Sequence, residues 1–313
     1  MIRHNWTIEE AKDLFLLPMN DLLFKSHTVF RKNFDPNKMQ VSTLLNIKEG
    51  GCTENCGYCS QNVHNNKEVR NTELIELQQV KESAQRAKDA GLTRLCMGAA
   101  WRNPKEKDMS HIKEIIKTVK GMGLQACMTL GMVTQEQAKE LKEVGLDYFN
   151  HNLDTSREHY PNVVTTRTYD DRLRTLEYVR NAGLNVCCGG IVGLGENIDD
   201  RASMLCTLAN LPEHPHSVPI NMLVKLDGAK MLDCEEVDHL DFVRMIAVAR
   251  IMLPKSHVRL SAGRSEMSES TQAMCFFAGA NSIFYGDKLL TTENVSQEDD
   301  LALFAKLGLE IER

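Results

Sequence analysis

The chain has 313 residues, 42% of them hydrophobic and 26% charged, which is enough apolar sequence for one large domain or two small ones. Its formal net charge of -6 provides no basic surface for a phosphate backbone, so we expect a small substrate and no nucleic acid partner. No apolar run approaches the roughly 18 residues of a membrane span, and Met1 to Trp6 lack a signal-peptide hydrophobic segment; both predict a cytoplasmic protein without a membrane partner.

Residues 7–35 are predicted to be helical, beginning with a T-x-x-E capping box formed by Thr7 and Glu10. The apolar positions of this segment are Leu14, Leu17, Leu22 and Phe24. We treat residues 1–40 as an N-terminal helical extension, which could cover the bottom of a barrel or form a dimer contact.

From residue 41 to 313 the sequence alternates between strand-like and helix-like segments. Parallel pairing with right-handed crossovers follows from this alternation, and eight strands are the number that closes a (β/α)8 TIM barrel. An open, doubly wound sheet is the alternative. The predicted strands are 41–47, 93–99, 124–130, 147–153, 185–192, 218–226, 257–262 and 280–286.

Three cysteines follow the first predicted strand in a C-x3-C-x2-C spacing: Cys52, Cys56 and Cys59. The spacing lets three sulfurs face one point, as three irons of a 4Fe-4S cluster require, and leaves the fourth iron open for a ligand. Two simpler readings remain: a zinc knuckle completed by a distant Cys or His, and a redox dithiol of Cys56 and Cys59.

Three further cysteines, Cys96, Cys127 and Cys187, occupy the middle of predicted strands 2, 3 and 5. Each alone could be a small core residue, but together they could converge inside a barrel as a second metal site. Because side chains alternate along a strand, Cys187 and Cys188 must point to opposite sides. Arg259, on predicted strand 7, needs compensation if buried, so it pairs with a carboxylate or belongs to that site.

Polar residues interrupt two other strands. Asn150, Asn152 and Asp154 are two apart and share one face, which suits ribose hydroxyls or a urea-like ring, although a turn-forming Asn/Asp cluster is the alternative. Asn221 is a similar polar residue in predicted strand 6. A glycine-rich G-x-I-x-G-x-x-E stretch runs from Gly189 to Glu196.

The remaining cysteines are predicted to be structural. A chain of this size in a reducing compartment does not need disulfides, so thiols that bind no metal pack as small hydrophobic residues. We assign Cys206, Cys234 and Cys275 to such packing within helix-like stretches.

The cysteine spacing and the aromatic Tyr58 resemble the signature of radical S-adenosylmethionine enzymes, and the glycine-rich stretch resembles the segment these enzymes place against adenine. Over nearly its whole length the chain resembles the biotin synthase family. The matching stretches begin at Arg3 and include residues 52–59, 97–102, 148–156, 165–169, 189–196, 221–225, 258–264 and 271–285. Two positions depart from the family pattern: Thr53 to Asn55 stand where a proline-led spacer is expected, and Cys188 replaces a small residue such as Ser.

The resemblance implies a set of ligands and contacts. Cys52, Cys56 and Cys59 would bind a 4Fe-4S cluster that chelates S-adenosylmethionine, while Cys96, Cys127, Cys187 and Arg259 would bind a 2Fe-2S cluster. The cofactor would contact Asn152, Asp154, Arg172, Ile191 and Gly193. The substrate dethiobiotin would lie among Asn150, Asn152 and Asn221.

The resemblance also implies the reaction: 5'-deoxyadenosyl radicals would abstract hydrogen at C9 and C6 of dethiobiotin, and sulfur from the 2Fe-2S cluster would close the ring of biotin. A homodimer, an electron donor such as flavodoxin and the iron-sulfur assembly machinery would be its partners. The alternatives are a related radical enzyme acting on another small molecule, or a zinc-stabilised binding protein without catalysis.

Overall fold

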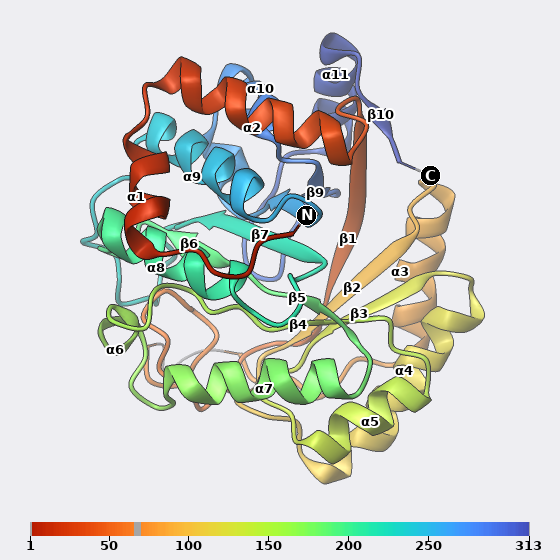
Figure 1. The fold of residues 1–313 in the computed structure, drawn as a ribbon. Coiled ribbons are helices and arrows are strands. Elements are labelled where there is room, and N and C mark those ends of the chain that lie inside the picture. Colours follow the sequence, from red (N-terminus) through yellow and green to blue (C-terminus); the bar gives the residue numbers. More distant parts are fainter. Residues whose placement is uncertain (1, 66–69, 313) are drawn as a thin grey trace.

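Parallel strands close into a barrel in the computed structural model, which describes residues 2–65 and 70–312 (Figure 1). β1 pairs with β2 on one side and with β9 on the other, so the sheet has no open ends and the open-sheet alternative is wrong. The strands are β1 (Lys38–Lys48), β2 (Arg94–Ala99), β3 (Gln125–Thr129), β4 (Tyr148–Asn150), β5 (Asn185–Cys187), β6 (Gly190–Val192), β7 (Ser217–Met222), β8 (His257–Leu260), β9 (Ser282–Phe284) and β10 (Glu310–Ile311).

All eight predicted strands are present, with two differences. The fifth is divided into β5 and β6, because Cys188 and Gly189 interrupt the ladder; β6 pairs with β7, and its Gly190 forms an isolated bridge with Asp154. The two-residue β10, near the C-terminus of the chain, was not predicted; it pairs in parallel with the first two residues of β1.

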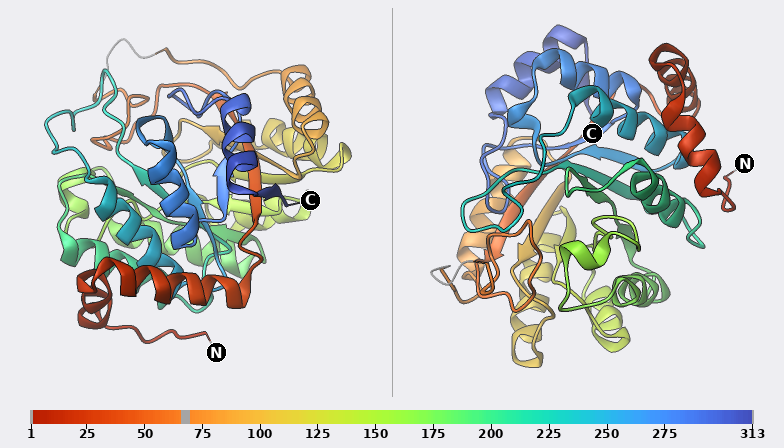
Figure 2. Two further views of the ribbon diagram at one scale, coloured as in Figure 1. Left: turned by 90° about the horizontal axis from the view of Figure 1, so that it is seen from above. Right: turned by 90° about the vertical axis from the view of Figure 1, so that its left-hand side faces the viewer.

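Helices surround the strands on the outside (Figure 2). Thr134, Thr168, Asn197 and Ser268 cap the starts of four of them through side-chain oxygens that accept backbone N–H groups. The helices after β1 are α3 (Leu77–Asp89), α4 (Glu106–Gly121), α5 (Gln135–Glu143), α6 (Tyr160–Val163), α7 (Tyr169–Asn181), α8 (Ile198–Ala209), α9 (His239–Met252), the 3-10 helix η1 (Arg264–Glu266), α10 (Glu269–Ala278) and α11 (Gln297–Leu307).

The N-terminal segment forms two helices, α1 (Ile8–Leu16) and α2 (Met19–Asn33), separated at Pro18. The capping box of Thr7 and Glu10 is confirmed. Both helices pack on the outer side of α8, α9 and α10, at the end of the barrel where the strands begin (Figures 1 and 2). Phe24, unlike Leu14 and Leu22, is 76% exposed and does not pack. The division at residue 40 stays a prediction, with β1 beginning at Lys38.

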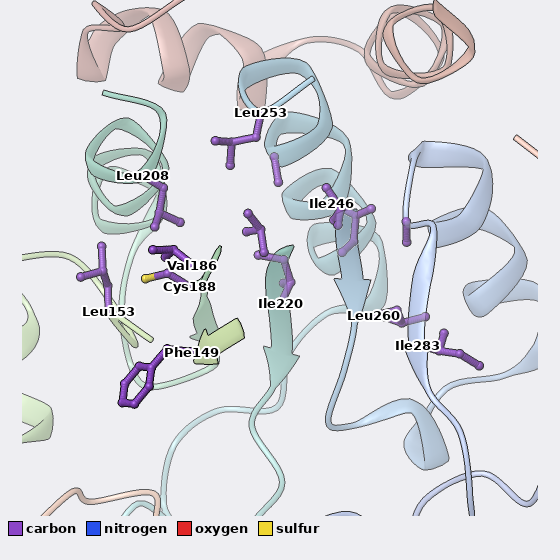
Figure 3. Packing of buried hydrophobic residues seen from close by; sticks show 14 of the residues in the cluster. Phe149, Leu153, Val186, Cys188, Leu208, Ile220, Ile246, Leu253, Leu260 and Ile283 are labelled. Atoms are coloured by element: carbon purple, nitrogen blue, oxygen red, sulfur yellow. The ribbon is translucent and has the colours of Figure 1, made fainter. Parts of the chain in front are cut away.

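The main hydrophobic core fills the layer between the strands and the helices. Figure 3 shows Cys188 in this layer with Leu153, Val186 and Leu208. Cys187 instead belongs to a separate buried group on the inner side of the barrel, so the predicted opposition of Cys187 and Cys188 is confirmed. No helix in the two described ranges is long and apolar enough to cross a membrane.

Candidate active site

The Cys52–Cys59 loop leaves the carboxyl end of β1 and is fixed by backbone hydrogen bonds on several sides. Cys52 exchanges bonds with Gln61 and Val63. Gly57 donates to the carbonyl of Val163 at 2.9 Å, and its own carbonyl accepts from Lys230 at 2.8 Å. A Cβ at Gly57 would lie 2.8 Å from the Met231 side chain, so a larger residue here would require that side chain to move.

Burial is the main influence on the pKa values of the thiols in this loop. It raises the pKa of Cys52 and Cys56, and it raises the pKa of Cys59 to about 12. These side chains are therefore protonated at neutral pH unless a metal takes the place of the proton, which is the usual exchange when thiolates bind metal.

The second group of cysteines converges inside the barrel. Cys96 and Cys127 are direct neighbours in the β2–β3 register, and Cys187 lies opposite Asn150 in the β4–β5 register. The three thiols are buried, with 2–4% of each residue exposed, and form a group apart from the main core. The predicted convergence is confirmed.

The pKa values of the three thiols in this group differ. Hydrogen bonding with the Cys127 thiol lowers the pKa of Cys96 to about 6 and also lowers that of Cys187, and the nearby Arg259 and Arg94 guanidinium groups add to both effects. The pKa of Cys127 is raised, because its hydrogen bonds with Cys187 and Cys96 favour its protonated form. The pocket therefore favours thiolates at Cys96 and Cys187 and a thiol at Cys127.

Arg259 lies on the same inner surface with 3% of its area exposed. Its guanidinium donates to the hydroxyls of Ser282 at 2.8 Å and Ser42 at 3.3 Å and to Gln40 Oε1 at 3.3 Å, and it lies 4.5 Å from the Phe284 ring centroid. No ion pair among the described residues joins it to a carboxylate, so of the two expectations for Arg259 the carboxylate pair is wrong.

Two adjoining cavities connect the cysteine groups. One, of about 280 Å³, is lined by Cys96, Cys127, Cys187 and Arg259; the other, of about 200 Å³, is lined by Cys52, Cys56 and Cys59. Both include Asn150, Asn152 and Asp154 in their walls, which confirms that these three residues share a face. A molecule bound here would therefore lie between the two sulfur groups.

Polar side chains around the cavities are held by specific partners. Asp154 forms a buried ion pair with Arg172, and its φ of 70° places it at a strained turn after β4. Asn152 accepts from the N–H of Gly189 at 3.2 Å. Asn221 donates to the carbonyl of Gly190 and accepts from Ala262, which fixes its amide at the cavity wall.

The glycine-rich stretch contributes to one cavity only in part. Ile191 lines the larger cavity, whereas Gly193 lines neither. Gly193 has a φ of 102°, and with Leu194 it donates to the carboxylate of Glu196, which also accepts from Arg201. The glutamate of the motif thus organises the turn itself.

The cysteines assigned to packing behave as expected in two cases. Cys275 is fully buried and Cys206 is 6% exposed, with its thiol donating to the carbonyl of Thr7 at 3.2 Å. The helical placement of Cys234 is wrong: it is partly exposed in the irregular segment before α9, where Gly228 and neighbouring turns interrupt the helical pattern.

Sequence reasoning missed several residues at the site. Arg94, two positions before Cys96 and hence on the same face of β2, lies 3.5 Å from the Tyr148 ring centroid; that spacing was an available signal. Arg167 donates to Cys56 Sγ at 3.3 Å, a contact between distant segments that no local pattern predicts. Leu289 to Thr292, from the turn after β9, also line the larger cavity.

The donor chemistry of the two sulfur groups fits iron-sulfur clusters, which proteins hold through cysteine thiolates. Within residues 2–65 and 70–312 no three or more His, Cys, Asp or Glu side chains are grouped to hold one metal ion. A cluster distributes its thiolates over several irons, and Cys52, Cys56 and Cys59 all line one cavity.

Comparison with known proteins agrees with this geometry. Residues 48–206 match the Radical SAM superfamily, and residues 219–310 match the Biotin and Thiamin Synthesis associated domain. The biotin synthase of Pseudomonas fluorescens is 59% identical over 99% of this chain and 89% of its own length, and that of Hahella chejuensis is 58% identical over 100% and 88%.

Solved structures share the fold at low identity. Methylornithine synthase superimposes with a TM-score of 0.83 and 18% identity, covering 98% of this chain and 94% of that one. The hydrogenase maturase HydG of Carboxydothermus hydrogenoformans gives 0.86 and 17%, covering 98% and 76%. With 59% identity over nearly the full length and both family models matched, the chain belongs to the biotin synthase family of radical S-adenosylmethionine enzymes.

Proposed function

We propose that this protein converts dethiobiotin to biotin by inserting sulfur at C9 and C6, with a 4Fe-4S cluster at one end of the joined cavities and a 2Fe-2S cluster at the other. The observation that carries the proposal is that two separate cysteine groups line adjoining cavities with shared polar walls. When bound, the clusters and S-adenosylmethionine supply the electron, the radical and the sulfur atom.

The residues of the smaller cavity would hold the radical source. Cys52, Cys56 and Cys59 would ligate three irons of the 4Fe-4S cluster, leaving one iron for S-adenosylmethionine. Asn152 and Asp154 would orient the ribose, with Asp154 kept in place by Arg172. Ile191 would pack against the adenine, and Gly193 would act through the shape of the turn rather than by direct contact.

The residues of the larger cavity would hold the sulfur source and the substrate. Cys96, Cys127, Cys187 and Arg259 would ligate the 2Fe-2S cluster, in a pocket whose cations already favour thiolates. Asn150, Asn152 and Asn221 offer amide groups to the ureido ring of dethiobiotin. Enclosure between the two groups would keep the substrate oriented and shield reactive intermediates from water.

We further propose a cytoplasmic homodimer that receives electrons from a donor such as flavodoxin and clusters from the iron-sulfur assembly machinery. All ten cysteines are free, which suits a reducing compartment. The exposed apolar side chains of Leu16 and Phe24 on α1 and α2 would be available for contacts between subunits.

An anaerobic assay tests the proposed function. The purified protein, reconstituted with iron and sulfide and supplied with S-adenosylmethionine, a reductant and dethiobiotin, should form biotin. Cleavage of S-adenosylmethionine without biotin formation would instead favour a related radical enzyme with another small-molecule substrate, and a colourless protein that binds only zinc would contradict the cluster assignment.

A further inference from the structure

A buried guanidinium lies against the middle cysteine of the Cys52–Cys59 loop. Arg167 NH2 donates to Cys56 Sγ at 3.3 Å, and only 5% of the Arg167 side chain is exposed. We propose that Arg167 is a positioning residue that raises the reduction potential of the 4Fe-4S cluster by hydrogen bonding to this cysteine sulfur. The inference rests on the proposed function for the presence of that cluster.

Arg167 is held by contacts that direct one nitrogen to the sulfur. Its Nε donates to the hydroxyl of Tyr160 at 3.0 Å, and its NH1 lies 3.7 Å from Glu54 Oε1. These two contacts leave NH2 for Cys56. Glu54, with 2% of its side chain exposed, is fixed in turn by the hydroxyl of Thr166.

The segment that carries Arg167 is fastened to the cysteine loop by Asn55, one of the positions that depart from the family pattern. Asn55 Oδ1 accepts from the backbone N–H groups of Thr165 at 2.9 Å and Thr166 at 3.2 Å, and its Nδ2 donates to Thr165 Oγ1 at 2.6 Å. These hydrogen bonds hold residues 165–167 against the loop, and they therefore fix the distance between Arg167 and Cys56.

The two neighbouring arginines, Arg172 and Arg102, have other partners. Arg172 also donates to the Tyr160 hydroxyl, at 3.1 Å, but it forms an ion pair with Asp154. Arg102, which also pairs with Glu54, has 40% of its side chain exposed and donates to the carbonyl of Thr166. Within residues 2–65 and 70–312, Arg167 is thus the guanidinium with a hydrogen bond to a cysteine of the Cys52–Cys59 loop.

Reduction of the cluster adds one negative charge, part of which resides on the cysteine sulfurs. A hydrogen bond from a cation stabilises the more negative state more strongly, and in a low-dielectric pocket the difference is larger than in water. Arg167 should therefore favour the reduced cluster, which is the state that donates the electron to S-adenosylmethionine.

Redox titration of the reconstituted full-length protein, monitored by the electron paramagnetic resonance signal of the reduced four-iron cluster, tests this role. Arg167→Gln removes the charge and should lower the equilibrium constant for one-electron reduction by roughly tenfold, equal to 59 mV. Arg167→Lys keeps the charge and should recover most of the wild-type potential. The control is Arg157→Gln, since Arg157 is half exposed, pairs with Asp170 and lines neither of the two cavities.

An unchanged potential in Arg167→Gln would overturn the proposal. So would equal shifts in Arg167→Gln and Arg167→Lys, or loss of the cluster from both variants with the fold intact, because either result would assign Arg167 a structural role only. The wild-type assay for biotin separates this test from the proposed function: a titratable four-iron cluster with no biotin formed would contradict the function while leaving the role of Arg167 to be decided by the potentials.

Discussion

Arg259 differs from the cysteines around it because it is cationic yet directed to the same cavity. It is anchored by neutral partners, the hydroxyls of Ser282 and Ser42 and the amide of Gln40, which hold its position without neutralising it by a carboxylate. A guanidinium in such a place could serve a metal only by losing a proton to it, as bound water and thiols do.

Replacement of Arg259 should therefore be tolerated. We predict that Arg259→Met retains the 2Fe-2S cluster and forms measurable biotin, because three thiolates still hold the irons. Iron and sulfide analysis together with a biotin assay measure both quantities. Complete loss of the two-iron cluster from Arg259→Met would show that the arginine is indispensable.

Cys275 and Cys206, which we assign to packing, allow a comparison with the cysteines that we assign as cluster ligands. Each should lose about 1 kcal/mol of unfolding free energy when changed to Ala, because a small buried side chain is truncated. Denaturant unfolding measures the loss, and cluster iron should stay at the wild-type level. A drop in iron in either folded variant would reveal a misassigned ligand.

At the scale of the elements, the junction between β5 and β6 shows why some features escape sequence reasoning. The continuous apolar run 185–192 reads as one strand, yet a Cβ at Gly189 would lie 1.9 Å from the carbonyl oxygen of Pro219 on β7. That contact joins residues thirty positions apart, and no local pattern contains it. By contrast, the β2, β3 and β5 cysteines were predictable as a group, because parallel strands of a barrel bring mid-strand residues together.

Gly189→Ala should be strongly destabilising. The added methyl meets backbone rather than a movable side chain, so we expect a loss of roughly 3 kcal/mol of unfolding free energy. Gly121→Ala is the control, since its Cβ would meet nothing within 4 Å, and a gain of about 0.5 kcal/mol is expected at the end of α4. Equal stability of the two variants in denaturant unfolding would refute the packing argument.

At the scale of the whole molecule, a buried ion pair joins the C-terminal helix to the barrel. Arg264 of η1 and Asp300 of α11 both have fully buried side chains, and Gln272 of α10 also accepts from Arg264. The turn that lines the larger cavity, residues 289–292, lies between β9 and α11. Because Arg264 also donates to the carbonyl of Phe284 in β9 at 3.2 Å, it connects the two elements on either side of this turn.

We predict that Asp300→Asn lowers the unfolding free energy by about 3 kcal/mol, because it leaves the buried Arg264 charge without its partner. Glu298→Gln, an exposed change two residues earlier on the same helix, should have little effect. Thermal unfolding compares the stability of the two variants. An Asp300→Asn protein as stable as Glu298→Gln would refute the anchoring role.

The barrel as a whole was predictable because strands and helices alternate from residue 41 onward. The ligand candidates were predictable because three cysteines have a C-x3-C-x2-C spacing and three more lie in the middle of predicted strands. The joining of two cavities at Asn150, Asn152 and Asp154 was less accessible, since it depends on how the Cys52–Cys59 loop folds over the barrel. That junction is the feature on which the proposed reaction depends.

The most direct test of this account measures 5'-deoxyadenosine and biotin from wild type, Cys56→Ala and Cys187→Ala under anaerobic conditions with dethiobiotin. Cys56→Ala should form neither product, because the radical source is lost. Cys187→Ala should keep the four-iron cluster and form no biotin, because the sulfur source is lost. Normal 5'-deoxyadenosine from Cys56→Ala, or biotin from Cys187→Ala, would contradict the assignment of the two cysteine groups.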